Sequence, residues 1–386
     1  MRTVIASAAT AAALVLTMST AALAGGSVAD SPDRRDRGGP THTRPVDDVV
    51  VIGHRGASGY RPEHTLASYE LAIEQCVDFI EPDLVSTKDG VLVARHENEI
   101  GGTTDVENHP EFADRRTTKA IDGRQVEGWF TEDFTLAELR TLRAEERIPN
   151  LRPENTAYNG LYQIPTFEEV VELATQSKTC DGRPMGIAPE IKHPSYFDSI
   201  GLSMEEGVVA ILEEYGYAGR RAPVVIQSFE TSNLRELDRM IKVDLAQLVD
   251  CSGAPYDLVA AGDPRTYADL VTPAGLKEIS RYADILGACK DRMIPRNADG
   301  SLAAPTTLVD DAHKAGLEVH GWTFRAENQF LPLDFRSSAD PAAHGDLAGE
   351  IERFLELGMD GLFSDHPDIA VAAASAFEQE QHPGRR

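Results

Sequence analysis

Glu81 and Asp83 stand two residues apart in a short apolar segment, and Glu190 and Lys192 repeat that spacing further along the chain. Residues i and i+2 of a β-strand point to the same face, so each pair converges if its segment is extended. Three carboxylates with no cysteine or histidine among them form an oxygen-only ligand set, which suits Ca²⁺ or Mg²⁺ better than zinc. The spacing therefore predicts that Glu81, Asp83 and Glu190 bind one divalent cation. The alternative is an ion-pair network in which Glu190 only neutralises Lys192.

Two histidines fall close to these acids in the expected fold. His54 follows an apolar run, and His96 ends a second extended segment after Asp83. Hydrolysis of a phosphodiester needs a base for the attacking oxygen and an acid for the leaving alkoxide, and imidazoles titrate near neutral pH. We therefore expect His54 and His96 to be the acid–base pair. Arg55 and Lys192 add positive charge where a phosphoryl group would bind, although Arg55 could instead pair with a carboxylate in a structural role.

Three further side chains lie near the ends of the expected strands. Trp322 is a candidate wall for the carbons of a substrate, with a place in the core as the alternative. Glu63 either reaches the site or supports the loop that precedes the first helix. Arg325 follows the same strand as Trp322 and is a candidate support. The remaining histidines, among them His193, have no spacing that suggests metal ligation.

A β-hairpin is expected to bring His96 back to the acids. Asp89-Gly90 stands between two extended runs, which is a strong signal for a two-residue turn. If Asp89 and Gly90 are the central turn residues, Asp83 lies directly opposite His96. Opposite residues of a hairpin point to one face, with Cβ atoms about 4.5–5.5 Å apart.

Short apolar runs alternate with amphipathic segments along the rest of the chain. Strands that alternate with helices pair in parallel through right-handed crossovers, and this pattern predicts a TIM (β/α)8 barrel with catalytic groups at the carboxyl ends of its strands. Residues 97–164 break the alternation and are expected to form a charged insertion after strand two and its hairpin. The expected strands are Val49–Gly53, Phe79–Leu84, Gly186–Lys192, Val224–Phe229, Leu245–Asp250, Ile285–Ala288, Glu318–Phe324 and Gly361–Ser364. The expected helices are Leu66–Gln75, Phe167–Ser177, Met204–Tyr215, Asn233–Ile241, Gly275–Ala283, Thr306–Ala315 and Asp346–Leu357.

The two ends of the chain differ in composition from the barrel. An apolar stretch followed by Ala22-Leu23-Ala24 predicts a secretory signal peptide over residues 1–24. Residues 25–46 are mostly Gly, Ser, Asp, Arg, Pro and Thr, which predicts a flexible linker. The barrel domain is expected over residues 47–378 and a tail over residues 379–386. We therefore expect a secreted or extracytoplasmic protein whose mature form has no membrane span.

The formal net charge of −26 limits the partners of the protein. So acidic a chain disfavours sequence-independent binding to nucleic acid or to anionic membrane surfaces. A substrate that carries phosphate must then be met by local cations or by a metal ion. The sequence leaves the oligomeric state open.

Four cysteines in an exported chain, none with C-x-x-C spacing, favour disulfides over zinc binding. Cys251 follows the fifth expected strand and Cys289 ends the sixth, so both fall at the carboxyl rim of the barrel. Cys76 ends the first helix and Cys180 precedes the third strand, which places both at the opposite rim. We therefore predict the pairs Cys251–Cys289 and Cys76–Cys180, with free buried thiols as the alternative.

The order of these motifs resembles the glycerophosphodiester phosphodiesterase family over about residues 48–372. The resemblance implies a TIM barrel in which His54 and His96 are the acid–base pair. It also implies that the three carboxylates hold the metal and that Arg55 and Lys192 contact phosphate. The Pro-Glu-His-Thr form and the large insertion are more similar to the periplasmic, Ca²⁺-using subgroup, so Ca²⁺ is favoured over Mg²⁺. The matching segments are His54–Leu66, Glu81–Asp83, Thr87–Gly90, Val93–His96, Glu190–Lys192, Gly321–Phe324 and Asp360–Asp365.

The chain departs from the family pattern at the rim of the site. His96-Glu97 stands where the family often has His-Asp, and Gly101-Gly102-Thr103-Thr104 replaces a frequent Arg-Thr-Thr. Arg325 stands where many members have Asn. These differences bear on the substrate rim more than on the chemistry.

The expected function is metal-dependent hydrolysis of glycerophosphodiesters to sn-glycerol 3-phosphate and an alcohol. Related alternatives are a phospholipase C-like or D-like lipase and a teichoic-acid phosphodiesterase on the same barrel. An alternative of a different class is a non-catalytic barrel that binds phosphate or lipid. The presence of both histidines and all three carboxylates argues against that last alternative.

Overall fold

The structure is a computed structural model, and it describes residues 48–381. The expected signal peptide, the expected linker and the end of the expected tail (residues 382–386) lie outside the described residues. The last described helix, α13, continues to Gln381. Among the helices of the described residues, none has the length and hydropathy that a bilayer crossing requires.

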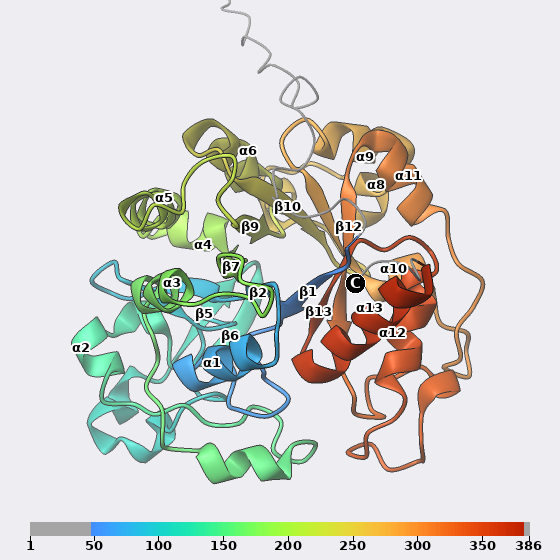
Figure 1. Cartoon of the computed structure of the whole chain (residues 1–386). Coiled ribbons are helices and arrows are strands. Elements are labelled where there is room, and N and C mark those ends of the chain that lie inside the picture. Colours follow the sequence, from blue (N-terminus) through green and yellow to red (C-terminus); the bar gives the residue numbers. More distant parts are fainter. Residues whose placement is uncertain (1–47, 382–386) are drawn as a thin grey trace, which may run out of the picture. The chain divides into compact units, whose positions relative to one another are not determined.

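The strands form a closed parallel barrel at the centre of the described chain, with the helices around it (Figure 1). The sheet order is β4-β3-β8-β9-β10-β11-β12-β13-β1-β2-β7. Only two residues separate β2 from β3, and only two separate β7 from β8, so each pair is one barrel strand in two segments and the sheet closes. This is the expected (β/α)8 architecture. The barrel strands are β1 (Val50–Gly53), β2 (Phe79–Ile80), β3 (Asp83–Ser86), β7 (Gly186–Ile187), β8 (Glu190–Ile191), β9 (Val225–Ser228), β10 (Asp244–Val249), β11 (Ile285–Cys289), β12 (Glu318–Phe324) and β13 (Gly361–Ser364).

Prolines divide the second and third barrel strands at the same height. Pro82 separates β2 from β3, and Pro189 separates β7 from β8. Proline lacks the backbone N–H that a ladder position needs. The hydrogen bond from Glu190 N to Pro82 O (3.0 Å) nevertheless keeps the two strands side by side across the break. Glu81 and Asp83 therefore flank an interruption beside Glu190.

The helices cover the outside of the barrel with their apolar faces. Capping side chains start several of them; Thr65, for example, accepts a hydrogen bond from Ser68 N at the start of α1. A second, smaller apolar cluster fills the inside of the barrel and includes Ile52, Phe79 and Phe363. The helices outside the insertion are α1 (Leu66–Glu74), α3 (Phe167–Gln176), α4 (Pro194–Ser199), α5 (Glu205–Glu214), α6 (Thr231–Met240), α7 (Tyr256–Ala260), α8 (Tyr267–Leu270), α9 (Pro273–Ile279), α10 (Lys290–Met293), α11 (Leu308–Ala315), α12 (Leu347–Leu355) and α13 (Pro367–Gln381).

The expected hairpin forms, but its predicted register is wrong by one residue. Antiparallel β3 and β4 (Leu92–Ala94) pair Leu84 with Ala94, so Arg95 rather than His96 lies opposite Asp83. Arg95 N donates to Asp83 O at 2.9 Å. The loop has three residues instead of two, with Gly90 in the left-handed region (φ 79°), as is usual for three-residue hairpin loops.

The insertion between β4 and α3 is ordered and has its own small core. It contains a two-stranded sheet of β5 (Thr117–Ile121) and β6 (Arg124–Gly128) and a short helix, α2 (Leu136–Leu139). Phe112 packs edge-on against Phe134 with ring centroids 5.0 Å apart. Trp129 Nε1 donates to Phe112 O at 2.8 Å. These contacts hold the insertion as a defined structure beside the barrel.

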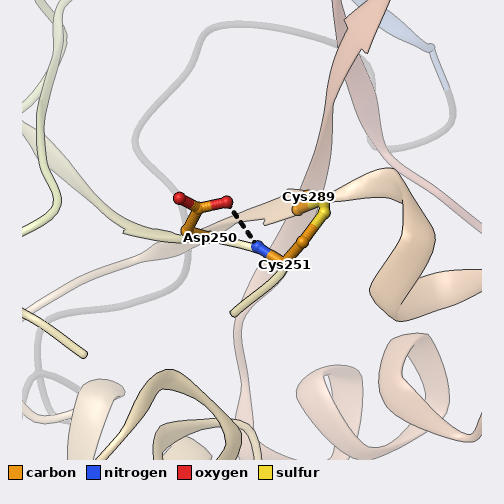
Figure 2. Close-up of side chains that lie close together, drawn as sticks. All are labelled: Asp250, Cys251 and Cys289. Atoms are coloured by element: carbon orange, nitrogen blue, oxygen red, sulfur yellow. Dashed lines mark hydrogen bonds between the residues drawn. A yellow bond between two sulfur atoms is a disulfide. The ribbon is translucent and has the colours of Figure 1, made fainter. Parts of the chain in front are cut away.

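Both predicted disulfides are present. Cys76–Cys180 and Cys251–Cys289 each have a Cα–Cα distance of 5.3 Å. Figure 2 shows Cys251 beside Asp250, which accepts a hydrogen bond from Cys251 N at 2.6 Å. The described residues contain no free cysteine. The second disulfide joins the end of β10 to the end of β11 at the carboxyl rim.

Candidate active site

A cavity of about 350 Å³ opens at the carboxyl ends of the barrel strands. His54, Arg55, Glu81 and Glu190 line one part of it, together with His96 from the hairpin. Its other part includes the second disulfide and aromatic side chains together with the charged residues Lys290, Asp291, Arg296 and Arg325. The position is where TIM-barrel enzymes carry their catalytic groups.

The three predicted metal ligands meet at the floor of this cavity. One carboxylate oxygen each of Glu81, Asp83 and Glu190 lies within 4.8 Å of the others. All three residues are buried, and Asp83 pairs with Glu190 in the β3–β8 ladder. Burial and the charges of its two neighbours raise the pKa of Glu81 well above its usual range. Burial also raises the pKa of Glu190, to about 7.

This cluster has the donors that a hard divalent cation needs. Asp83 Oδ1 is buried without a hydrogen-bond partner, and like charges so close together repel each other unless a cation lies between them. Carboxylate oxygens alone suit Ca²⁺ or Mg²⁺. The three residues therefore fit the expected ion.

His54 is held from the side opposite the carboxylate cluster. Its Nδ1 lies 2.5 Å from Asp365 Oδ1, and its Nε2 lies 3.9 Å from Glu81 Oε2. A carboxylate at Nδ1 keeps the proton there and leaves Nε2 to face the cavity. Although burial raises the pKa of Asp365, Arg325 and Arg152 hold it well below its usual range. Burial and the charge of nearby Arg55 lower the pKa of His54 to about 4.

His96 reaches the same cavity from the far side. Its Nδ1 lies 3.0 Å from Glu97 Oε1, and its Nε2 lies 3.5 Å from Lys192 Nζ. Lys192 Nζ also contacts Glu190 Oε1 at 2.8 Å. Lys192 therefore lies between a predicted metal ligand and a predicted acid–base group. Burial, followed by the charges of Arg55 and Lys192, lowers the pKa of His96 to about 3.

Arg55 lines the cavity and is fixed from behind by Glu63. Its Nη1 donates to both carboxylate oxygens of Glu63, at 3.0 and 3.1 Å. Arg147 of the insertion donates to the same carboxylate at 2.8 Å. Although burial raises the pKa of Glu63, these two guanidinium groups hold it well below its usual range. Glu63 thus supports Arg55 and does not line the cavity.

Two further residues support the site although no role was expected for them from the sequence. His64 Nε2 lies 2.9 Å from Asp83 Oδ2, and its Nδ1 lies 2.8 Å from the Tyr69 hydroxyl. Arg152, from the insertion, donates to Asp365 Oδ2 at 2.5 Å. The contact between Arg152 and Asp365 joins segments 213 residues apart in sequence, so only the folded chain reveals it. The left-handed backbone of His64 (φ 54°) is the local feature that turns its ring toward Asp83.

Trp322 and Arg325 line the other part of the cavity. Trp322 Nε1 donates to Gly287 O at 3.0 Å, and its ring packs edge-on against Phe229 with centroids 5.6 Å apart. Trp322 thus lines the cavity. Arg325 Nε donates to Asp365 Oδ2 at 2.8 Å, and its guanidinium lies 4.7 Å from the centroid of Phe330.

Comparison with known proteins identifies the family. Residues 54–369 match the model of the glycerophosphoryl diester phosphodiesterase family. The chain belongs to this family. A glycerophosphodiester phosphodiesterase of Arabidopsis thaliana is 38% identical, over 81% of this chain and 82% of the relative. One of Haemophilus influenzae is 29% identical, over 86% and 91% respectively.

Solved structures show the same fold. A phosphodiesterase of Oleispira antarctica, in complex with the product sn-glycerol-3-phosphate, superposes with a TM-score of 0.56. The two are 21% identical, and the match covers 85% of this chain and 97% of that structure. The chain is thus an enzyme of the glycerophosphoryl diester phosphodiesterase family on the family's α/β barrel, and the expected fold and family are confirmed.

Proposed function

We propose that the protein is a secreted enzyme that hydrolyses glycerophosphodiesters to sn-glycerol 3-phosphate and an alcohol. The observation that carries this proposal is the placement of two carboxylate-paired histidines and three buried carboxylates around one cavity. Its membership of the glycerophosphoryl diester phosphodiesterase family points to the same substrate class. The name of the Arabidopsis thaliana relative and the product in the Oleispira antarctica structure agree with it.

Glu81, Asp83 and Glu190 would hold one divalent cation, with Ca²⁺ favoured over Mg²⁺. A bound cation of this kind polarises phosphoryl oxygens and neutralises their charge. Arg55 and Lys192 bring two more positive charges to the same end of the cavity, where they would orient the phosphoryl group. Local cations of this kind are needed because the chain as a whole carries a net charge of −26.

His54 and His96 divide the proton transfers between them. One ring accepts a proton from the attacking water at Nε2 as the water oxygen bonds to phosphorus, and the other ring, which starts the step with a proton on Nε2, donates that proton to the alkoxide as the old phosphorus–oxygen bond breaks. The carboxylates at both Nδ1 atoms keep the Nε2 atoms toward the cavity. The two rings come from different elements, His54 from the end of β1 and His96 from the end of the hairpin.

Secretion is supported by the composition of the first residues and by the two disulfides. Disulfides persist in oxidising compartments and are rare in the cytosol. A chain exported in this way would meet glycerophosphodiesters outside the cytoplasm.

The test is release of glycerol 3-phosphate from glycerophosphocholine by the purified chain, with and without EDTA. We expect turnover that EDTA abolishes and that added Ca²⁺ restores. His54→Ala and His96→Ala should each lower kcat by roughly 10²–10⁴, the usual contribution of a general acid or base. Full turnover in EDTA, with no metal found in the protein by elemental analysis, contradicts the metal assignment. Near-normal kcat in either histidine variant contradicts its assigned role.

A further inference from the structure

A continuous line of charged side chains leads from the insertion to His96. Glu97 Oε1 lies 3.0 Å from His96 Nδ1, and its other oxygen, Oε2, lies 3.0 Å from His193 Nε2. His193 Nδ1 in turn lies 2.6 Å from Asp122 Oδ2. Glu97 binds one histidine with each of its two carboxylate oxygens, and His193 binds one carboxylate with each of its two ring nitrogens. Each of these side chains is therefore held by its neighbours.

The backbone conformation orients Asp122 and His193, the two members of this line furthest from His96. Asp122 and Gly123 are the two central residues of the β5–β6 hairpin, where Ile121 pairs with Arg124. Both have positive φ (46° and 75°), the geometry that Asp-Gly turns adopt in two-residue hairpins. His193 follows Lys192 in the left-handed region (φ 49°). This bend sends the His193 side chain toward the insertion while Lys192 faces the carboxylate cluster.

The charges along the line alternate. Although burial lowers the pKa of His193, its hydrogen bonds to Asp122 and Glu97 raise it to about 9. Burial raises the pKa of Glu97, but the two histidines hold it below its usual range. An imidazolium therefore stands between two carboxylates at neutral pH. On its other side His96 faces Lys192, Arg55 and Asp83.

We propose that Glu97, His193 and Asp122 are positioning residues for His96, and that the insertion takes part in catalysis by anchoring them. The inference rests on the proposed function, in which His96 transfers a proton. Glu97 is half-exposed, with 49% of its side chain accessible, so without His193 its carboxylate is free to turn to solvent. His193 fixes Glu97, and Asp122 fixes His193. The orientation of the His96 ring thereby depends on a hairpin of the insertion.

The line also explains why Glu97 can stand where the family often has Asp. The longer side chain reaches His96 with one oxygen and His193 with the other. A shorter carboxylate on the same backbone would have less reach toward the second histidine. The departure from the family pattern and the presence of His193 and Asp122 therefore belong to one arrangement.

The test compares His193→Gln, His193→Ala and Asp122→Asn with the wild-type enzyme. We expect His193→Ala to lower kcat by about 10–100-fold with little change in KM, the scale for residues that orient a functional histidine. His193→Gln, which keeps one hydrogen-bond donor, should recover part of that loss. His313→Gln is the matched control, because His313 also contacts a carboxylate, Asp360 at 2.8 Å, but on α11 away from the cavity. That variant should keep wild-type kcat.

The pH dependence of kcat distinguishes a positioning role of His193 from a purely structural one. His193 is charged below a pKa of about 9 and loses its charge as the pH rises through that value. We therefore expect kcat of the wild type to fall near pH 9, and we expect His193→Gln to lack that step. Asp122 and Glu97 are the acidic groups that face His193 among the described residues, so Asp122→Asn should move the step to lower pH.

Nitrogen-15 NMR of the His96 ring separates this inference from the proposed function. The Nδ1 and Nε2 shifts, assigned with His96→Gln, should change in His193→Ala and stay unchanged in His313→Gln, whether or not the wild type turns over glycerophosphocholine. Unchanged His96 shifts together with wild-type kcat in both His193→Ala and Asp122→Asn would overturn the proposal. An inactive wild type with the expected NMR changes would overturn the proposed function alone.

Discussion

Asp365 Oδ1 lies 2.5 Å from His54 Nδ1, which is the same relationship that Glu97 has with His96. The surroundings of the two carboxylates differ. Asp365 is buried and held by two arginines, Arg152 and Arg325, through its second oxygen, whereas Glu97 is half-exposed. Both catalytic candidates thus have a carboxylate at Nδ1. Asp365 is held more firmly than Glu97, so the His54 ring is the more firmly fixed of the two.

Replacing Asp365 tests this difference. Asp365→Asn keeps the size of the side chain but removes the negative charge and allows the His54 ring to take the wrong tautomer. We expect kcat to fall by about 10–100-fold, the scale for groups that orient a functional histidine. Asp368→Asn is the control. Asp368 lies three residues after Asp365, and its exposed carboxylate accepts a hydrogen bond from the Tyr60 hydroxyl. Equal kcat in the two variants would show that His54 needs no such partner.

The carboxylate cluster makes a second prediction. Glu81→Gln, Asp83→Asn and Glu190→Gln should each abolish most activity and weaken Ca²⁺ binding measured by calorimetry, because each replaces a charged carboxylate ligand with a neutral amide. Asp291→Asn is the control, since Asp291 lines the other part of the cavity. The control should bind Ca²⁺ as the wild type does. Calcium binding that survives all three ligand substitutions would place the ion elsewhere.

Much of the fold and the clustering of the three carboxylates could be predicted because both depend on short-range patterns. Alternating apolar runs mark strands and helices, and two residues at i and i+2 on a strand share a face whatever lies around them. Glu81 and Asp83 kept that relationship even though Pro82 divides the strand. The ends of neighbouring parallel strands meet at one rim, which is why Cys251 and Cys289 could be paired in advance.

The hairpin register could not be settled in this way. Asp89-Gly90 fits both a two-residue turn and the end of a three-residue loop, and the choice depends on side-chain contacts. Thr87 Oγ1 donates to Asp89 Oδ1 at 2.7 Å and accepts from Val91 N at 2.9 Å, which closes the longer loop. His96 nevertheless lines the cavity. It follows the last paired residue of β4, Ala94, so the hairpin ladder does not fix the direction of its side chain.

The supporting residues of the site escaped prediction for a different reason. Asp365 is distant in sequence from His54, and Asp122 is distant from His193, so no local pattern links either pair. The Asp122-Gly123 dipeptide did carry a hairpin signal, but the charged residues around it looked irregular. What the hairpin faces depends on the packing of the whole insertion.

The two disulfides should differ in their effect on activity. The chain-entropy model gives each of them about 4–5 kcal/mol of unfolding free energy, for sequence separations of 104 and 38 residues. Serine at both positions of either pair should therefore lower Tm by several degrees. Only the loss of Cys251–Cys289 should also lower kcat/KM, because that disulfide lines the cavity and Cys289 pairs with Trp322. Equal kcat/KM in the two double variants would show that Cys251–Cys289 does not contribute to the substrate site.

Glu230, outside the cavity, should make the free energy of unfolding depend on pH. It is 3% exposed and accepts hydrogen bonds from Ser195 N and Ser195 Oγ. Burial, followed by the charges of Asp257 and Asp122, raises its pKa to about 8. A pKa raised above the unfolded value of about 4.5 means that folding favours the protonated acid. That contribution is fully present below about pH 4.5 and is lost as the pH rises through about 8.

Glu230→Gln cannot ionise and should therefore become the more stable protein as the pH rises. The amide oxygen can still accept from Ser195, so little else changes. We expect the Tm of the variant to exceed that of the wild type by clearly more at pH 8.5 than at pH 5, measured by thermal unfolding. Glu213→Gln on the exposed face of α5 is the control, and its Tm difference from the wild type should be the same at both pH values. If the Glu230→Gln difference is also independent of pH, Glu230 is ionised in the folded protein throughout this range and its burial is offset by contacts stronger than those of Ser195.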